Sequence, residues 1–297
     1  MMEKAPHEAG RGLAQRSGIG ASALVVQHSS LRFSRIANDL PALILLRHGT
    51  KTLLGTGSSG GAWTVGAGEA IAIAAGQTFD VDNRLSAAGA YEAQWLVWDP
   101  AIIARYSHVP GGERTLEGAA PLGRIEGHFE AAFARARAAV EDAAGVPVPV
   151  AEHRMAEVLV WLALRGIRFA PQQAPTLAAR VRHMLQAAPG EPWTLAVAAR
   201  RMAMSEATLR RRLAEEGCSF GALLADTRMS LAMVLLQSTD HPVNRIALDV
   251  GYESASRFAI RFRARFGFAP TAIRGHQRSL ATLAAPAPAA PGPAASR

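Results

Sequence analysis

The sequence predicts a two-domain chain of the α+β class, in which a small antiparallel β-barrel or sandwich and two helices precede a domain made only of helices. Three observations lead to this prediction. Short strand-like segments separated by turn residues run to about residue 99, apolar residues then recur at helical spacing, and a Pro- and Gln-containing stretch at 170–175 precedes a wholly helical remainder. The 297 residues suffice for two cores.

Six segments of the N-terminal half have the short apolar composition of β-strands. Glycine, asparagine and aspartate separate them, which is typical of antiparallel strands joined by tight turns. The predicted strands cover residues 23–26, 31–36, 43–46, 51–54, 70–74 and 91–97.

Two amphipathic helices are predicted to follow the strands. The first carries Ile125, Phe129, Phe133 and Val140 at helical spacing and ends before Gly145. In the second, an i, i+3, i+4, i+7 stripe contains Met155, Val158, Leu159 and Leu162. We expect these helices to cover an open side of the strands or to pair with a second subunit.

The predicted domains cover residues 21–170 and 175–278. Residues 1–20 are predicted to be disordered. So are residues 279–297, because this Ala- and Pro-rich tail has almost no bulk or charge with which to fold.

Residues 194–217 have the pattern of a helix-turn-helix unit. Thr194 caps a short helix over 195–201, a turn follows, and Ser205 caps a second helix that Gly217 ends. Leu209 and Leu213 would face the core, which leaves an outer set of Ala207, Arg210, Arg211 and Arg212.

The same pattern returns after a longer apolar helix over 220–237. A helix over 242–248 leads through a turn at Gly251 to a cap at Ser254 and a helix over 255–266, whose inward series is Phe258, Phe262 and Phe266. The 18 residues of the connecting helix span roughly 27 Å. This length is near the roughly 34 Å between successive major-groove segments on one face of DNA, so one chain is expected to contact both.

Positive charge is concentrated in the helical part. Residues 1–174 carry 16 Lys and Arg against 16 Asp and Glu, whereas residues 175–278 carry 15 Arg against 8 Asp and Glu, a net charge of +7. This asymmetry indicates that the C-terminal part binds a polyanion.

Residues 176–278 resemble the DNA-binding domain of the AraC/XylS family of bacterial transcription regulators. The first half of the match rests on Leu195, Ala199, Met204, Ser205, Leu209, Arg211, Leu213, Gly217, Ser219, Phe220, Arg228, Ala232, Leu235 and Leu236. The second half rests on Ile246, Ala247, Gly251, Tyr252, Ser254, Ser256, Phe258, Phe262, Phe266, Gly267, Pro270 and Arg274.

The resemblance implies which side chains contact base edges: Ala207, Arg210 and Arg211 in the first unit, and Ala255, Ser256, Arg257 and Ile260 in the second. Ile260 departs from the family pattern, which commonly has a polar residue there, so Arg257 and Arg261 are the expected base contacts of that helix. We assign a second set to phosphates, namely Arg200, Arg201, Ser205, Arg245, Ser254 and Arg263.

The resemblance also implies that residues 21–170 form a cupin-like β-barrel that serves as a sensor and dimerisation domain. The expected protein is a cytoplasmic, homodimeric activator whose partners are double-stranded DNA, RNA polymerase and a small-molecule or protein effector. Two alternatives remain open: an adaptor whose N-terminal domain binds a regulatory protein, and a cupin-type enzyme fused to a DNA-binding module.

Several features argue against other classes of protein. One cysteine, Cys218, cannot build a disulfide framework, and the histidines have no metal-binding spacing. The sequence lacks the histidine pair that a cupin enzyme needs and any long uninterrupted apolar run. We therefore expect no catalytic residues, metal, cofactor or membrane span. Cys218 is expected to be a small packed residue, and Trp193 an apolar anchor.

Overall fold

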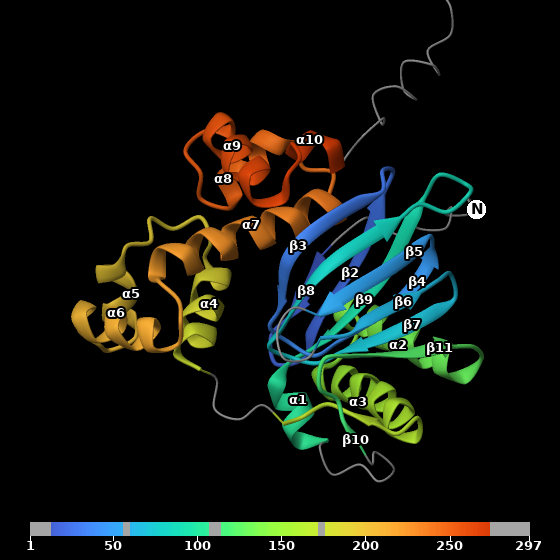
Figure 1. Ribbon diagram of the computed structural model, residues 1–297. Helices are drawn as coiled ribbons and strands as arrows, with labels where there is room; N and C mark the ends of the chain where they lie inside the picture. Colours follow the sequence, from blue (N-terminus) through green and yellow to red (C-terminus); the bar gives the residue numbers. More distant parts are fainter. Residues whose placement is uncertain (1–12, 56–59, 107–113, 172–175, 274–297) are drawn as a thin grey trace, which may run out of the picture.

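The computed structural model describes residues 13–55, 60–106, 114–171 and 176–273. These residues form a β-rich N-terminal domain and a helical C-terminal domain (Figure 1). The two-domain α+β class is therefore confirmed. Most of the predicted boundary at 170–175, Arg274 and the predicted disordered tail lie outside the described residues.

One sheet of the N-terminal domain has six strands, and its neighbouring strands are antiparallel. In spatial order they are β1 (Leu13–Arg16), β2 (Gly20–Gln27), β9 (Tyr91–Trp98), β4 (Ala42–His48), β7 (Glu69–Ile73) and β11 (Ala119–Arg124). Strand β4 is buried from Ala42 to Leu46 without alternation, because both faces of this sheet are covered.

A second, four-stranded sheet faces the first. Its order is β3 (Leu31–Asn38), β8 (Gln77–Arg84), β5 (Thr50–Gly55) and β6 (Ala62–Val65). Side chains such as Ile44, Leu53 and Val81 fill the space between the sheets. The strands form two facing sheets, which is the sandwich alternative of the sequence prediction. Within the described residues they do not close into the barrel that the family resemblance implied.

Helices cover the outer face of the six-stranded sheet. These are α1 (Pro100–Arg105), α2 (His128–Glu141) and α3 (Val148–Leu164), and a short parallel pair, β10 (Arg114–Thr115) and β12 (Ile167–Arg168), lies beside them. Trp98 is fully buried there, and its indole Nε1–H donates to the Met155 carbonyl at 3.1 Å. The two predicted amphipathic helices thus form and cover a sheet face.

Strand β1 lies within the segment that the sequence predicted to be disordered. Its Arg16 guanidinium donates to the carbonyls of Ala139 and Val146, at 2.8 and 2.7 Å, at and beyond the end of α2. Nonlocal hydrogen bonds and pairing with β2 therefore order a segment whose own sequence has little apolar content.

The C-terminal domain contains seven helices in its described part: α4 (Leu177–Ala187), α5 (Leu195–Arg201), α6 (Glu206–Glu215), α7 (Phe220–Ser238), α8 (Val243–Asp249), α9 (Ala255–Phe266) and α10 (Pro270–Ile273). Figure 1 shows α7 running from the α4–α6 unit to the α8–α10 unit. By length and composition α7 is apolar enough to cross a membrane. In this fold, its Leu223 belongs to the core of the first unit, while Met229 and Met233 belong to that of the second.

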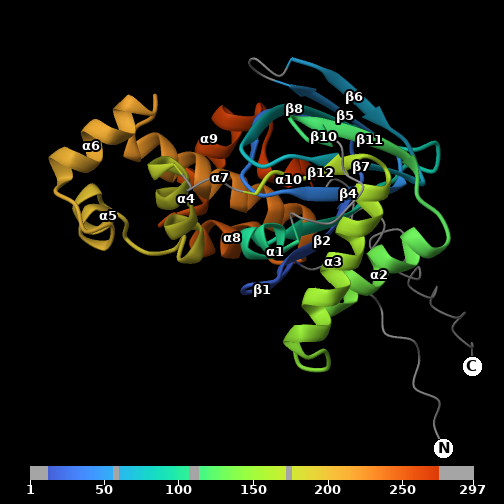
Figure 2. The same cartoon turned by 90° about the horizontal axis from the view of Figure 1, so that it is seen from below.

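The two domains pack together along a seam beside β2 and β3, which we call the domain seam. Phe33 of β3 contacts Phe268, with ring centroids 6.0 Å apart, and Arg265 donates to the Ser34 carbonyl at 2.7 Å. Arg182 of α4 forms an ion pair with Asp39. Figure 2 shows, from below, the first helical unit on one side of α7 and the sheets on the other.

Candidate nucleic-acid interface

The first helix-turn-helix unit consists of α5 and α6, each capped as the sequence predicted. Thr194 Oγ1 accepts from the Val197 N–H at 3.2 Å, and Ser205 Oγ accepts from the Thr208 N–H at 3.1 Å. Helix α6 ends at Glu215, and Gly217 follows with φ at +73°. Leu209 is fully buried. The buried leucines fix the side of α6 that faces the protein.

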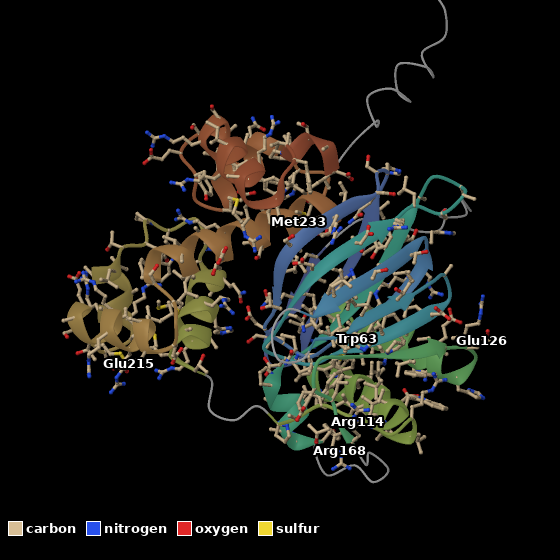
Figure 3. The ribbon with its side chains drawn as sticks, in the orientation of Figure 1. Trp63, Arg114, Glu126, Arg168, Glu215 and Met233 are labelled. Atoms are coloured by element: carbon tan, nitrogen blue, oxygen red, sulfur yellow. The ribbon has the colours of Figure 1, made fainter. Side chains whose placement is uncertain are left out.

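The outer side of α6 carries the predicted base-contacting residues. Successive residues of a helix are about 100° apart, so Ala207 and Arg211 lie opposite the buried Leu209 and Leu213. The Arg211 side chain is 70% exposed, 3.5 Å from Glu215 Oε1. Arg210 is also exposed but lies to one side, where it lines a surface hollow next to α7. Figure 3 labels Glu215 at the end of this helix.

The second unit repeats this construction with α8 and α9. Ser254 Oγ accepts from the Arg257 N–H at 3.3 Å, and Gly267 ends the helix at φ +85° while donating to the Arg263 carbonyl at 2.8 Å. The predicted phenylalanine series is buried, with ring centroids 5.5 Å apart for Phe258 and Phe262 and 4.6 Å for Phe262 and Phe266. Packing of these rings fixes the orientation of α9.

The predicted base-contacting residues of α9 are all exposed. Ile260 is 67% exposed and lies almost opposite the phenylalanines. The Arg257 side chain is 77% exposed, 3.5 Å from Glu253 Oε2. The remaining members of this exposed set are Ala255, Ser256 and Arg261.

The residues assigned to phosphates fall into three groups. Arg200 and Arg263 are exposed and form no ion pair within the described residues. Arg201 pairs with Glu191 and lies over the Trp193 ring at 4.5 Å, and Arg245 pairs with Asp249 at 2.9 Å. The two serines use their hydroxyls as helix caps.

The turns of the two units adopt the same conformation with different residues. Ala203 has φ at +54°, and Gly251 has φ at +85° in the corresponding turn. In each turn the next residue donates back to the first helix, from Met204 N–H to Ala199 at 2.9 Å and from Tyr252 N–H to Ala247 at 2.8 Å. From the sequence, Gly251 indicated the second turn. The first turn was predicted only from the two helices on either side of it.

Arg228 of α7 is a positioning residue that links the two units. Its guanidinium donates to the carbonyls of Pro189, at 3.2 Å, and Glu191, at 2.9 Å, and lies 5.9 Å from the Tyr252 ring centroid. Burial lowers the pKa of Arg228 and raises that of Tyr252. The sequence pattern included Arg228 but gave no sign of this role, because its partners lie far along the chain.

Trp193 and Cys218, which the sequence predicted to be packed residues, are packed in the structure. Trp193 is buried against the first unit, and its indole donates to the Ala188 carbonyl at 2.7 Å, which confirms the anchor. Cys218 is partly buried beside Leu213, and burial raises the pKa of its thiol. No cluster of three or more His, Cys, Asp or Glu side chains suited to a metal occurs in the parts of the chain that the structure describes.

Comparison with known proteins identifies the helical domain. Residues 198–276 match the family model described as a helix-turn-helix domain. The regulator GadX of Escherichia coli is 35% identical over 97 residues, which cover 33% of this chain and 35% of GadX. The transcriptional activator AggR of Escherichia coli is 34% identical over 91 residues, covering 31% and 34% of the two chains. The matched segment thus spans about a third of these relatives.

A solved structure extends the likeness of the fold to both domains. ToxT of Vibrio cholerae, in a structure with a bound unsaturated fatty acid, superposes with a TM-score of 0.58 at 12% identity, covering 86% of this chain and 96% of ToxT. The apo structure of a ToxT variant gives a TM-score of 0.58 at 13% identity, covering 87% and 97% of the two chains. These matches confirm the AraC/XylS resemblance predicted for the helical domain, which is similar to a segment of named transcription regulators.

Proposed function

We propose that this chain is a sequence-specific transcription activator that contacts two adjacent major-groove segments of DNA. The observation that carries the proposal is the pair of capped helices, α6 and α9, each with an exposed arginine opposite its buried face. Arginine donates two parallel hydrogen bonds to a guanine edge in the major groove, so these faces suit base recognition. A relative named as an activator supports the sign of regulation.

The connecting helix supports simultaneous contact by both units. The 19 residues of α7 span about 28 Å, near the roughly 34 Å between major-groove segments on one face of DNA. Arg228 joins the turn of the second unit to the segment that precedes the first. The two recognition helices are therefore held as one body, and the site they bind should have a fixed internal spacing.

The proposal extends to the N-terminal domain and to further partners. We propose that residues 21–170 act as a cupin-like sensor that receives an effector and supports a homodimer, and that the DNA-bound protein contacts RNA polymerase. The bound fatty acid of the ToxT structure supports a small apolar effector. The names of the relatives support a regulator over an enzyme.

Selection of bound sequences from a random DNA pool tests the proposal. The full chain should enrich sites with two recognised blocks about 10 bp apart, centre to centre. Arg211→Ala should erase enrichment of one block and Arg257→Ala that of the other. Arg180→Ala, an exposed arginine of α4 outside both recognition helices, is the matched control and should leave both blocks. Absence of enrichment, or a single block, would contradict the proposal.

A further inference from the structure

The two recognition helices carry different side chains at one equivalent position. Each helix begins directly after a capping serine, and its sixth residue is Arg211 in α6 and Ile260 in α9. The fourth and eighth residues are buried leucines in α6 and buried phenylalanines in α9. A residue midway between two such positions lies about 160° from each around the helix. Arg211 and Ile260 therefore project in the same way from their units.

Ile260 is exposed although its side chain is wholly apolar. It is 67% exposed, and the other exposed large apolar residue in the described part of the C-terminal domain is Leu248 of α8. The core of the second unit is complete without Ile260, because Phe258 and Phe262 are fully buried and Phe266 is nearly so. The fold therefore does not require an isoleucine at this position.

The surface around Ile260 is positively charged. Helix α9 contains four arginines and no acidic residue, and Arg257, Arg261 and Arg263 are exposed. Residues three apart are neighbours on a helix surface, so Arg257 and Arg263 border Ile260. The centre of a protein interface is normally depleted of charge, whereas DNA combines a polyanionic backbone with base edges in its grooves. The charge around Ile260 therefore favours DNA as the occupant of this face.

The major groove offers one apolar partner to such a side chain, the C5-methyl group of thymine. Isoleucine has no hydrogen-bond donor or acceptor in its side chain, so it cannot bind the polar base edges that suit Arg211. Removal of one methyl group and its contact surface from water changes affinity about fourfold. An isoleucine at this position therefore favours thymine, where an arginine favours guanine.

We propose that Ile260 contacts the C5-methyl group of a thymine in the second major-groove segment and sets the preference for that base. The inference deepens the proposed function, on which it rests, by naming a base and the residue that selects it. Arg257 and Arg261 supply hydrogen bonds and charge beside this contact, and Ile260 supplies discrimination at one base pair. The two units thus read DNA by different chemistry from the same helical position.

Replacement of thymine by deoxyuridine removes the methyl group and leaves the hydrogen-bonding groups of the base unchanged. The site is one selected with the full chain, and each thymine of the block that depends on Arg257 is replaced in turn. Replacement at one position should weaken binding of the wild-type protein about three- to fivefold. Ile260→Ala should bind the thymine and deoxyuridine sites equally, because its side chain is too short to contact the methyl group.

An exchange of side chains tests the same position in a second way. Ile260→Arg gives the second unit the residue that the first unit has there, so selection with this variant should replace the thymine preference by guanine. The matched control is Leu248→Ala, which removes the other exposed apolar side chain and should keep the thymine preference. Thermal unfolding shows that each variant is folded before it is used.

Three outcomes would overturn the inference: equal binding of the wild-type protein to thymine and deoxyuridine at every position of the block, a loss on deoxyuridine that Ile260→Ala retains, or a thymine preference that Ile260→Arg retains. Each of them leaves the proposed function intact, because both blocks are still enriched. Failure of the wild-type protein to enrich two blocks would reject the proposed function, and this inference with it.

Discussion

Arg211 projects from α6 directly away from the core of the first unit. A bidentate contact from such a side chain to guanine contributes about 1–3 kcal/mol of discrimination, whereas a phosphate contact contributes equally on every sequence. We expect Arg211→Ala to weaken binding to a selected site by that amount and to change binding to random DNA little. Titrations against both DNAs at fixed salt measure the difference.

Arg200→Ala is the matched control for that experiment, because Arg200 is exposed in the same unit and forms no ion pair within the described residues. It should weaken selected and random DNA alike and reduce the slope of log affinity against log salt by about one. An equal loss on both DNAs for Arg211→Ala would remove Arg211 from the base-contacting set.

Lys51 gives the stability of the protein a dependence on pH. Its pKa is about 7 in the fold and near 10.5 when unfolded, so the unfolded chain binds more protons between these values. Stability should therefore rise with pH in this window, by up to about 1.4 kcal/mol per pH unit relative to Lys51→Met. Urea unfolding of both proteins at pH 7, 8 and 9 measures the slope, and parallel curves would contradict the prediction.

The sequence revealed the exposed side chains of the DNA-facing helices better than it revealed the burial of Lys51 between the two sheets. Exposure of Arg211 follows from its place in a helical repeat around Leu209 and Leu213. The inward direction of Lys51 depends on the register of β5 with β8, which a single short strand does not fix. The sequence did show that Lys51 lies two residues before the apolar Leu53. Alternate residues of a strand point to the same face, so both side chains lie on one face of β5.

At the level of elements, the turns of the two helix-turn-helix units differ in strain. Ala203 adopts a positive φ that costs a residue with a Cβ about 1–2 kcal/mol, while Gly251 adopts it freely. Glycine also loses more backbone entropy on folding, which offsets part of the gain. We expect Ala203→Gly to stabilise the protein by about 0.5–1 kcal/mol in chemical unfolding.

Gly251→Ala is the opposing variant. A Cβ at Gly251 would lie 2.5 Å from an Arg228 guanidinium nitrogen and 2.6 Å from the Pro189 carbonyl oxygen. We expect it to destabilise the protein by at least about 1 kcal/mol, because strain and steric overlap add. If Ala203→Gly left the free energy of unfolding unchanged while Gly251→Ala lowered it, the first turn would hold its positive φ without strain.

Several strands that the sequence missed are polar or irregular, and pairing with other strands orders them. Strands β6, β8 and β11 are flanked by irregular chain or contain polar and glycine residues. Strand β6 pairs with its neighbour β5, whereas β8 pairs with β3 and β11 with β7, both far back along the chain. Helices α5, α6 and α9 were predicted to within a residue, because capping side chains and apolar spacing act locally.

For the whole molecule, the domain seam combines an apolar contact with a partly buried ion pair. The Arg182 and Asp39 side chains are each 25% exposed, so water screens their attraction less than that of a surface pair. A double-mutant cycle with Asp39→Ala and Arg182→Ala should give a coupling energy of about 0.5–1 kcal/mol in the free energy of unfolding.

The same cycle on Asp82 and Arg84 is the control, since both lie in one strand and the Arg84 side chain is 72% exposed. That pair should give a coupling energy near zero. Equal coupling in both cycles would show that the Arg182–Asp39 pair does not contribute specifically to the seam in solution.

The sequence alone determined that this chain carries two capped helix-turn-helix units on apolar cores of leucine and phenylalanine. These features depend on residues within one or two helical turns of each other. The tertiary structure alone decided that the strands form two sheets, that Lys51 lies between them, and that Arg265 faces the domain seam while Arg263 is exposed. Those outcomes depend on strand pairing and packing between residues up to 231 positions apart, which no local pattern encodes.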